Sequence, residues 1–267
     1  MTYCVAIKLN EGVVCLADTR TNAGLDNIAK YRKLFTWSVP GDRVIAMMTS
    51  GNLAITQAVM SQIQEAIDRP VEGAETIFTA PSMFRVAEVV GTAMRNVQVQ
   101  YGPGLAASGQ SSDSSIVLAG QRAGGEVRLF LIYSAGNFIE ATDDTPFFQI
   151  GEHKYGKPIL DRVIQPQTPL EDAILAALLS MDSTLRSNLS VGMPLDLAVI
   201  RTGNFVFDRL HRIEDDDQDF RDLSQMWSTA LRQAFTDIRS AIGKKRTAAF
   251  QANAAPEHFD DFDHDDH

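Results

Sequence analysis

MTYCVAIKLNEGVVCLADTR, residues 1–20, places a strand-like run directly after the first methionine. Two β-rich segments, YCVAIKL and VVCLAD, flank the turn sequence NEG, which is the pattern of a β-hairpin. A secretory signal needs a basic front and an unbroken apolar stretch, whereas Lys8 and Glu11 interrupt this one. We therefore expect the folded domain to begin at Thr2.

Composition is that of an ordinary globular protein. The 267 residues are 45% hydrophobic, with a mean hydropathy of -0.09, which suffices for one large domain or two small ones. No window approaches the roughly 20 consecutive apolar residues of a membrane-spanning helix, so no membrane placement is expected. Cys4 and Cys15 lie in neighbouring predicted strands, and without an export signal we expect buried thiols in a reducing cytoplasm.

The net charge of -10 is concentrated at the C-terminal end. Residues 257–267 hold six acids and no Lys or Arg, so the remainder carries only -4. Nucleic acids and anionic membranes need clustered Lys and Arg, and KKR at 244–246 is the only tight basic cluster. Neither partner is expected. The tail HFDDFDHDDH could scavenge divalent ions, but such tails are more often solubilising ends, and we predict no metal site.

The central part of the chain alternates groups of strands with groups of helices. An apolar run at 43–50 precedes a helical pattern from Asn52 to Pro70, and a second helical stretch covers about 82–101. After the loop GPGLAASGQSSDSS, an antiparallel meander is predicted. Its strands are SIVLAG, EVRLFLIY and NFIEAT.

A second group of helices is predicted from about 155 onward. A short helix over 155–164 precedes TPLEDAILAALLSMDSTLRS, where Thr168 is expected to cap the helix, Pro169 to occupy its first position and Glu171 to complete a capping box. The remaining predicted elements are the strands LDLAVIRTG and NFVFDRL, an acidic linker at 214–222 and an amphipathic helix over 223–242. Hairpins and helix pairs without βαβ alternation favour a layered α+β fold, antiparallel sheets covered by helix pairs.

Several common chemistries are excluded by their motifs. There is no CxxC, HExxH or EF-hand loop. GEHKYGKP resembles a phosphate-binding loop, but Pro158 stands where Ser or Thr must bind magnesium, so we predict a strand-to-helix turn and no nucleotide cofactor. His153 has no nucleophile elbow near it.

Thr2 offers a different chemistry. Aminopeptidases that trim the initiator Met act when the second residue is small, so Thr2 could carry both a hydroxyl and a free α-amine. An α-amine with a pKa of about 7.7–8.0 can accept the hydroxyl proton as a general base. A nearby Lys held by a carboxylate would favour the neutral amine, and Lys33 and Asp18 are the candidates. Taken singly, each residue also has an ordinary interpretation: an Asp at a strand end is typical of a turn, and a Lys such as Lys33 is typical of an exposed surface.

The segments MTYCVAIKL, ADTRTNAG and RKLF together resemble the start of the proteasome-type N-terminal nucleophile peptidases. The resemblance is strongest to the bacterial Anbu group, relatives of the proteasome β-subunit and of the HslV peptidase. It covers about residues 2–208. Further matching segments are SGN, SSIVLAG, GEHKYGKPILDR and LRSNLSVGMPLDLAVI.

This resemblance implies a four-layer αββα sandwich with an N-terminal Thr at the end of a cleft between two antiparallel sheets. Thr2 would attack a peptide carbonyl, and Asp18 would position Lys33. Gly51 would match the glycine whose backbone N–H binds the oxyanion, and Ser190 the serine that hydrogen-bonds around the Thr amine.

Two positions depart from the family pattern. Glu152 stands where proteasome β-subunits usually have a serine, and Ser187 stands where they have the Asp of an Arg-Asp pair. Both belong to the set that tunes the Thr amine and its water, and Glu152 would add a negative charge there.

The resemblance also implies domain limits and partners. We expect the hydrolase domain over 1–208, a helical extension over 209–250 and a disordered acidic tail over 251–267. The expected partners are a peptide or unfolded-protein substrate, further copies in a ring or ring-like homo-oligomer, and a separate ATPase unfoldase. One apolar face of the last helix could pack on a neighbouring subunit or on its own domain. It comprises Leu223, Met226, Trp227, Leu231, Ala234, Phe235 and Ile238.

Three functions stay open at this point. The first is a threonine peptidase without an ATPase of its own. The second is a self-assembling scaffold or binding subunit whose Thr site is weak or idle. The third is an N-terminal nucleophile amidase acting on a small metabolite.

Overall fold

The computed structural model describes residues 2–22 and 28–253. Its first large sheet is antiparallel, in the order β10-β1-β2-β11-β12. The opening hairpin supplies β1 and β2, two of the three interior strands, and the sequence predicts this hairpin. The strands are β1 (Tyr3–Leu9), β2 (Gly12–Asp18), β10 (Phe147–Gly151), β11 (Leu195–Arg201) and β12 (Arg209–Ile213).

A second antiparallel sheet has the order β5-β6-β7-β8-β9. Its strands are β5 (Leu34–Val39), β6 (Arg43–Gly51), β7 (Ser114–Arg122), β8 (Arg128–Ile132) and β9 (Phe138–Glu140). A separate two-stranded ribbon joins β3 (Arg20–Asn22) to β4 (Ile28–Lys30).

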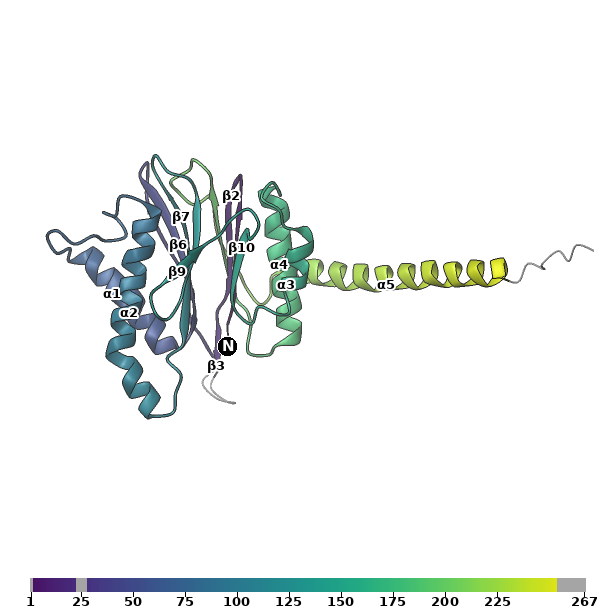
Figure 1. Ribbon diagram of the computed structural model, residues 1–267, viewed down its shortest axis with the longest axis horizontal. Helices are drawn as coiled ribbons and strands as arrows, with labels where there is room; N and C mark the ends of the chain where they lie inside the picture. Colours follow the sequence, from purple (N-terminus) through teal and green to yellow (C-terminus); the bar gives the residue numbers. More distant parts are fainter. Residues whose placement is uncertain (1, 23–27, 254–267) are drawn as a thin grey trace, which may run out of the picture. The chain divides into compact units, whose positions relative to one another are not determined.

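Helix pairs cover the outer faces of the two sheets (Figure 1). α1 (Leu53–Asp68) and α2 (Met83–Ala107) lie on one side, and α3 (Lys157–Val163) and α4 (Leu170–Ser187) lie on the other. The apolar core accordingly forms three layers: one under each helix pair and one between the sheets. This is the predicted αββα order.

The side chains of β1 alternate between two of these layers. Tyr3, Val5 and Ile7 belong to the layer under α3 and α4, whereas Cys4 and Ala6 belong to the layer between the sheets. Each large buried apolar side chain contributes about 1.5–3 kcal/mol. Small residues on the inner face bring the sheets together, and large residues on the outer face fill the space beneath the helices.

Backbone contacts bring the start of the chain to one end of the sandwich. Tyr3 pairs with Gly151 across β1 and β10, and Cys4 pairs with Ala17 near the end of β2. Asp18 pairs with Leu195 at the beginning of β11. The residues that precede β1, end β2 and end β10 therefore meet at the same edge.

Tertiary contacts correct the predicted cap of α4. The Thr168 hydroxyl accepts a hydrogen bond from the Gln165 N–H at 2.9 Å instead of capping, and Pro169 is the N-cap without a side-chain bond. The Glu11 carboxylate, from the distant β1–β2 turn, accepts from the Leu170 N–H at 3.3 Å. A residue remote in sequence thus replaces the predicted capping box, and Glu171 forms an ion pair with Arg209 instead.

Two other element limits differ from the prediction. α2 continues to Ala107 through Pro103, because Leu105 packs against the core under α1 and α2 and keeps a predicted loop segment helical. The strand predicted over 204–210 instead forms at Arg209–Ile213, where it can pair along β11. β5 and the β3–β4 ribbon were not predicted.

The chain divides into two compact units, one ending at Phe220 and the other starting at Arg221. α5 (Gln218–Asn253) begins where an acidic linker was predicted, with the Asp217 carboxylate accepting from the Phe220 N–H at 2.8 Å. It is longer than the predicted 223–242. Residues 209–213 of the predicted helical extension form β12, and the domain limits themselves stay a prediction. Residues 254–267 of the predicted acidic tail lie outside the described residues.

Candidate active site

Thr2 is buried at the start of β1, with 7% of its surface exposed. Its carbonyl accepts a hydrogen bond from the Glu152 N–H at 2.7 Å. Gly151 has a φ of +83°, and a Cβ built there would lie 1.9 Å from the backbone carbonyl oxygen of Thr2. Only glycine fits against Thr2 at this position. The backbone of the candidate nucleophile is therefore held by the β10 end and the turn after it.

Asp18 connects the strand end to three other segments. Its Oδ1 accepts from the Lys33 Nζ at 2.7 Å and from the Tyr3 N–H at 3.0 Å, and its Oδ2 accepts from the Gly192 N–H at 3.2 Å. The residue is completely buried. One carboxylate thus joins the residue after Thr2, the predicted lysine and the segment that follows α4.

Lys33 lies between β4 and β5 with a side chain that is 5% exposed. Its Nζ donates to the Arg20 carbonyl at 2.6 Å as well as to Asp18, and its own carbonyl accepts from the Thr49 N–H at 3.1 Å. The Asp18 carboxylate and the Arg20 carbonyl thus hold the ammonium between them. Asp18 and Lys33, fifteen residues apart, form a buried ion pair.

The surroundings of Asp18 act on its pKa in opposite directions. Burial is the largest effect and raises the pKa of the carboxyl, because water no longer solvates its charge. The Lys33 charge and the backbone N–H groups of Tyr3 and Gly192 lower it. The carboxylate oxygens receive three donors, one of them from Lys33, and these bonds stabilise the ionised carboxylate against the cost of its burial.

Gly51 ends β6 at the same edge of the sandwich. Its φ is +105°, and a Cβ there would lie 2.2 Å from the Asp113 carbonyl, so the position requires glycine. The hydroxyl of the preceding residue, Ser50, approaches a Cβ built on Gly151 to 3.2 Å. The β6 turn therefore lies against the same glycine that contacts Thr2.

The remaining predicted residues lie around this cluster at varied depth. Ser190 is half-buried in the segment after α4, and its N–H donates to the Asn188 side chain at 2.9 Å. Glu152 is joined to Thr2 by its backbone, and its 16%-exposed carboxylate lies 3.7 Å from Lys154. Ser187 is exposed at the end of α4, and the adjacent Arg186 pairs with Asp182 one turn back.

Arg20 and Gly192 are site residues that the sequence reasoning missed. Arg20 Nη1 donates to the Leu189 carbonyl at 3.0 Å, and a Cβ on Gly192 would lie 2.1 Å from Arg20 Nε. The guanidinium thus covers Gly192 and holds the segment that carries Ser190. The sequence ADTRTN could have indicated Arg20, because Arg20 follows Asp18 by only two residues and so lies close to the same site.

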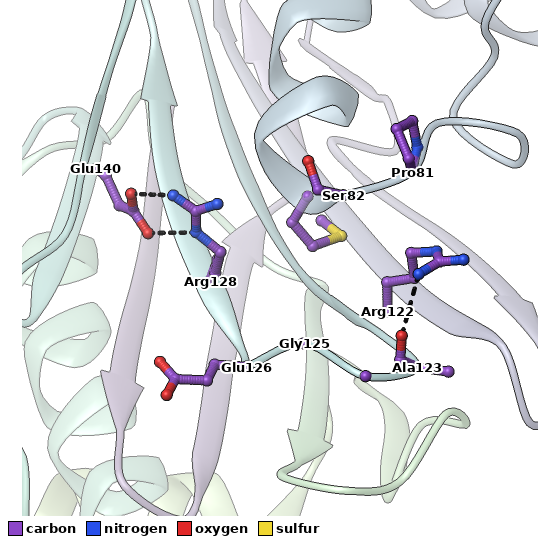
Figure 2. A pocket seen from close by; sticks show the side chains of 10 residues that line it. Pro81, Ser82, Arg122, Ala123, Gly125, Glu126, Arg128 and Glu140 are labelled. Atoms are coloured by element: carbon purple, nitrogen blue, oxygen red, sulfur yellow. Dashed lines mark hydrogen bonds and ion pairs between the residues drawn. The ribbon is translucent and has the colours of Figure 1, made fainter.

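A separate hollow of about 450 Å³ lies at the other end of the second sheet (Figure 2). Figure 2 shows that Arg128 faces Glu140 in a two-bond ion pair, while Arg122 donates to the Ala123 carbonyl. β7 runs from Ser114, the partner of Gly51, to Arg122, which places the hollow roughly 27 Å from Gly51 at 3.4 Å per residue. This hollow is not part of the Thr2 cluster.

Other features of the described residues add no chemistry of a different kind. No helix over 2–22 and 28–253 is long and apolar enough to cross a membrane. Within the same residues, no three His, Cys, Asp or Glu gather as metal ligands. Cys4 and Cys15 are free and buried, and burial raises the pKa of the Cys15 thiol to about 12.

Comparisons with known proteins agree on one family. Residues 2–200 match the family model described as proteasome subunit. The Gly-1 mutant of Anbu from Hyphomicrobium sp. strain MC1 is 53% identical over 88% of this chain and 97% of that one, with a TM-score of 0.83. No curated protein matches the chain.

Two further solved structures extend the comparison. Anbu from Yersinia bercovieri, described as an ancestral β-subunit, is 42% identical over 88% of this chain and 96% of its own, with a TM-score of 0.82. The Anbu complex from Pseudomonas aeruginosa, solved as a helical assembly, is 44% identical over the same shares, with a TM-score of 0.83.

Proposed function

Because this chain belongs to the proteasome subunit family, and within it to the Anbu group, we propose that it is a threonine peptidase subunit. It hydrolyses amide bonds of peptides or unfolded protein, with Thr2 as the nucleophile after Met1 is removed. It requires no cofactor. The observation that carries the proposal is the buried Asp18–Lys33 ion pair, whose carboxylate also binds the N–H of the residue after Thr2.

In the proposed reaction the Thr2 hydroxyl oxygen forms a bond to the substrate carbonyl carbon. The hydroxyl proton passes to the α-amine of Thr2, and the carbonyl π electrons move to its oxygen. Collapse of this intermediate breaks the C–N bond, and the leaving amine takes the proton from the α-amine. Water then hydrolyses the Thr2 ester by the same proton route, which frees the acid product and the enzyme.

The other site residues support these steps. The Lys33 ammonium keeps the α-amine neutral and ready to accept a proton, because a second cation nearby lowers the affinity for one. Asp18 positions Lys33. The Gly51 N–H stabilises the oxyanion, and Ser190 orients the α-amine. Glu152 adjusts the charge beside Thr2.

The active form is a homo-oligomer, ring-like or helical. This part of the proposal rests on the relative from Pseudomonas aeruginosa, whose complex was solved as a helical assembly. A folded substrate would need a separate ATPase unfoldase, since the sequence has no complete phosphate-binding loop. Measurement of the particle mass in solution tests the assembly.

Intact mass spectrometry of protein with an untagged N-terminus tests the nucleophile. The mass before and after incubation with a threonine-directed epoxyketone is compared for the native chain and for Thr2→Ala. We expect loss of Met1 and a single adduct that Thr2→Ala abolishes. Retained Met1, or a free Thr2 that never reacts, would refute the peptidase.

A self-assembling scaffold with an idle Thr site is the second candidate. Ser187 favours it, because this residue supplies no carboxylate to the site and its neighbour Arg186 pairs with Asp182. Under this alternative the protein assembles normally while Thr2 stays unmodified by the epoxyketone. A Thr2 adduct without peptide cleavage would instead point to a small amide as substrate.

A further inference from the structure

We propose that the side chain of Tyr3 is a positioning residue, which anchors Thr2 to the layer of α3 and α4. This inference rests on the proposed role of Thr2 as nucleophile. Tyr3 is completely buried, and its hydroxyl lies 2.6 Å from the Ser180 hydroxyl of α4. The Gln149 side-chain amide of β10 donates to the same hydroxyl at 2.6 Å.

Such an anchor would keep the N-terminal end of the chain from fraying. The first residues of a domain fray unless they are tied down, whereas a nucleophile must hold its position closely. Once Met1 is removed, Thr2 is covalently joined to Tyr3 alone. Tyr3 therefore acts together with the Glu152 N–H, which binds the Thr2 carbonyl, to set the position of the Thr2 hydroxyl and α-amine.

Tyr3 is held at two separate points, its backbone and its side chain. Its N–H donates to Asp18 at 3.0 Å, among the catalytic candidates, while its ring packs in the layer under α3 and α4. A rotation of Tyr3 about the strand would break the backbone bond to Asp18 or the bonds of the hydroxyl. The two sets of contacts define one orientation of the backbone at Thr2.

The socket around the hydroxyl is closely fitted. A Cβ built on Gly156, the N-cap of α3, would lie 2.7 Å from the Tyr3 hydroxyl and 2.1 Å from the Ser180 hydroxyl. Burial raises the pKa of Tyr3 to about 12, so the hydroxyl keeps its proton at physiological pH. It can accept from Gln149 and donate to Ser180 at the same time.

Tyr3→Phe tests the anchor because it retains the ring and removes only the hydroxyl. We expect the rate of Thr2 labelling by the epoxyketone to fall about tenfold or more, since small misplacements of a reacting group have effects of this size. Ile174→Val is the matched control. It removes one buried methylene from α4, six residues and roughly 9 Å along the helix from Ser180, and should label at the native rate.

Ser180→Ala keeps the test decisive if Tyr3→Phe does not fold. It removes one of the two hydroxyl partners, so we expect a smaller fall in the labelling rate. When added to Tyr3→Phe it should cause little further loss, because the two groups act through one hydrogen bond. Amide hydrogen exchange over residues 3–9 is measured alongside, and should be faster in Tyr3→Phe than in Ile174→Val.

The outcomes separate this inference from the proposed function. If Tyr3→Phe and Ser180→Ala are both labelled within twofold of the native rate, the anchoring role of Tyr3 is overturned and the peptidase function is unaffected. Absence of labelling in the native protein overturns the peptidase, and the anchoring role falls with it. A slow Tyr3→Phe beside a native-like Ile174→Val supports the anchor.

Discussion

Replacement of Lys33 by Met should destabilise the protein by about 3 kcal/mol at neutral pH. Met has a similar length and no charge, so the change removes the cation and leaves Asp18 buried. Breaking a buried ion pair by removing one partner costs about 3–5 kcal/mol. We expect the lower end of that range, because the Tyr3 and Gly192 N–H groups still donate to the carboxylate.

The stability that Lys33→Met loses should depend on pH, and the direction of this dependence follows from the pKa of Asp18. Burial already raises the pKa of this carboxyl above its ordinary value, and loss of the Lys33 charge raises the pKa further. A group whose pKa is higher in the folded state than in the unfolded state stabilises the fold at low pH. It loses that contribution as the pH rises through the folded-state pKa. Lys33→Met should therefore be less destabilising at acidic pH than at neutral pH.

Urea denaturation followed by circular dichroism at pH 5 and pH 8 measures both effects. Protein concentration is held constant, since assembly contributes to apparent stability. Lys30→Met is the matched control, because Lys30 and Asp215 form a pair whose side chains are both 60% exposed. It should cost less than about 1 kcal/mol. A Lys33→Met variant that loses no more than Lys30→Met, or whose loss does not change with pH, would refute the buried ion pair.

Three further variants test the geometry of the site. Gly151→Ala should destabilise by roughly 3 kcal/mol or more in urea denaturation, because of its φ and the contact with Thr2. Gly124→Ala, at a φ of +78° with nothing within 4 Å, should cost only about 1 kcal/mol, and equal losses would contradict the close approach. Thr2→Ser should keep epoxyketone labelling, because the hydroxyl and the α-amine remain; loss of the adduct would contradict their assigned roles. Arg20→Ala should slow labelling about tenfold at unchanged helix content, whereas a native rate would show that Arg20 does not position the segment with Ser190.

Several elements of the fold were readable from local sequence. The NEG turn predicted the β1–β2 hairpin, and Asn52 and Pro70 marked the limits of α1, where the Asn52 side chain does accept from the Ile55 N–H at 3.2 Å. These features depend on neighbours a few residues apart, so local patterns carry them. The family resemblance added the αββα order, which the two sheets and their helix pairs confirm.

Other elements depended on distant partners. Thr168 has the sequence of a helix cap, yet Glu11 caps α4 because the β1–β2 turn lies beside it in the fold. β5 is an edge strand with weak alternation, and its pairing with β6 is what makes it a strand. Local propensity is too small to decide such cases against packing.

By itself, the sequence determined the alternation of large and small residues in the opening hairpin, the helix pairs and the family pattern around Thr2. Only the tertiary structure decided which further groups meet at the site: Gly192 and the N–H of Tyr3 on Asp18, and Gly151 against Thr2. The reason is that hydrogen bonds and steric fit between segments up to 174 residues apart leave no local trace. A glycine in a sequence does not reveal which backbone will approach it.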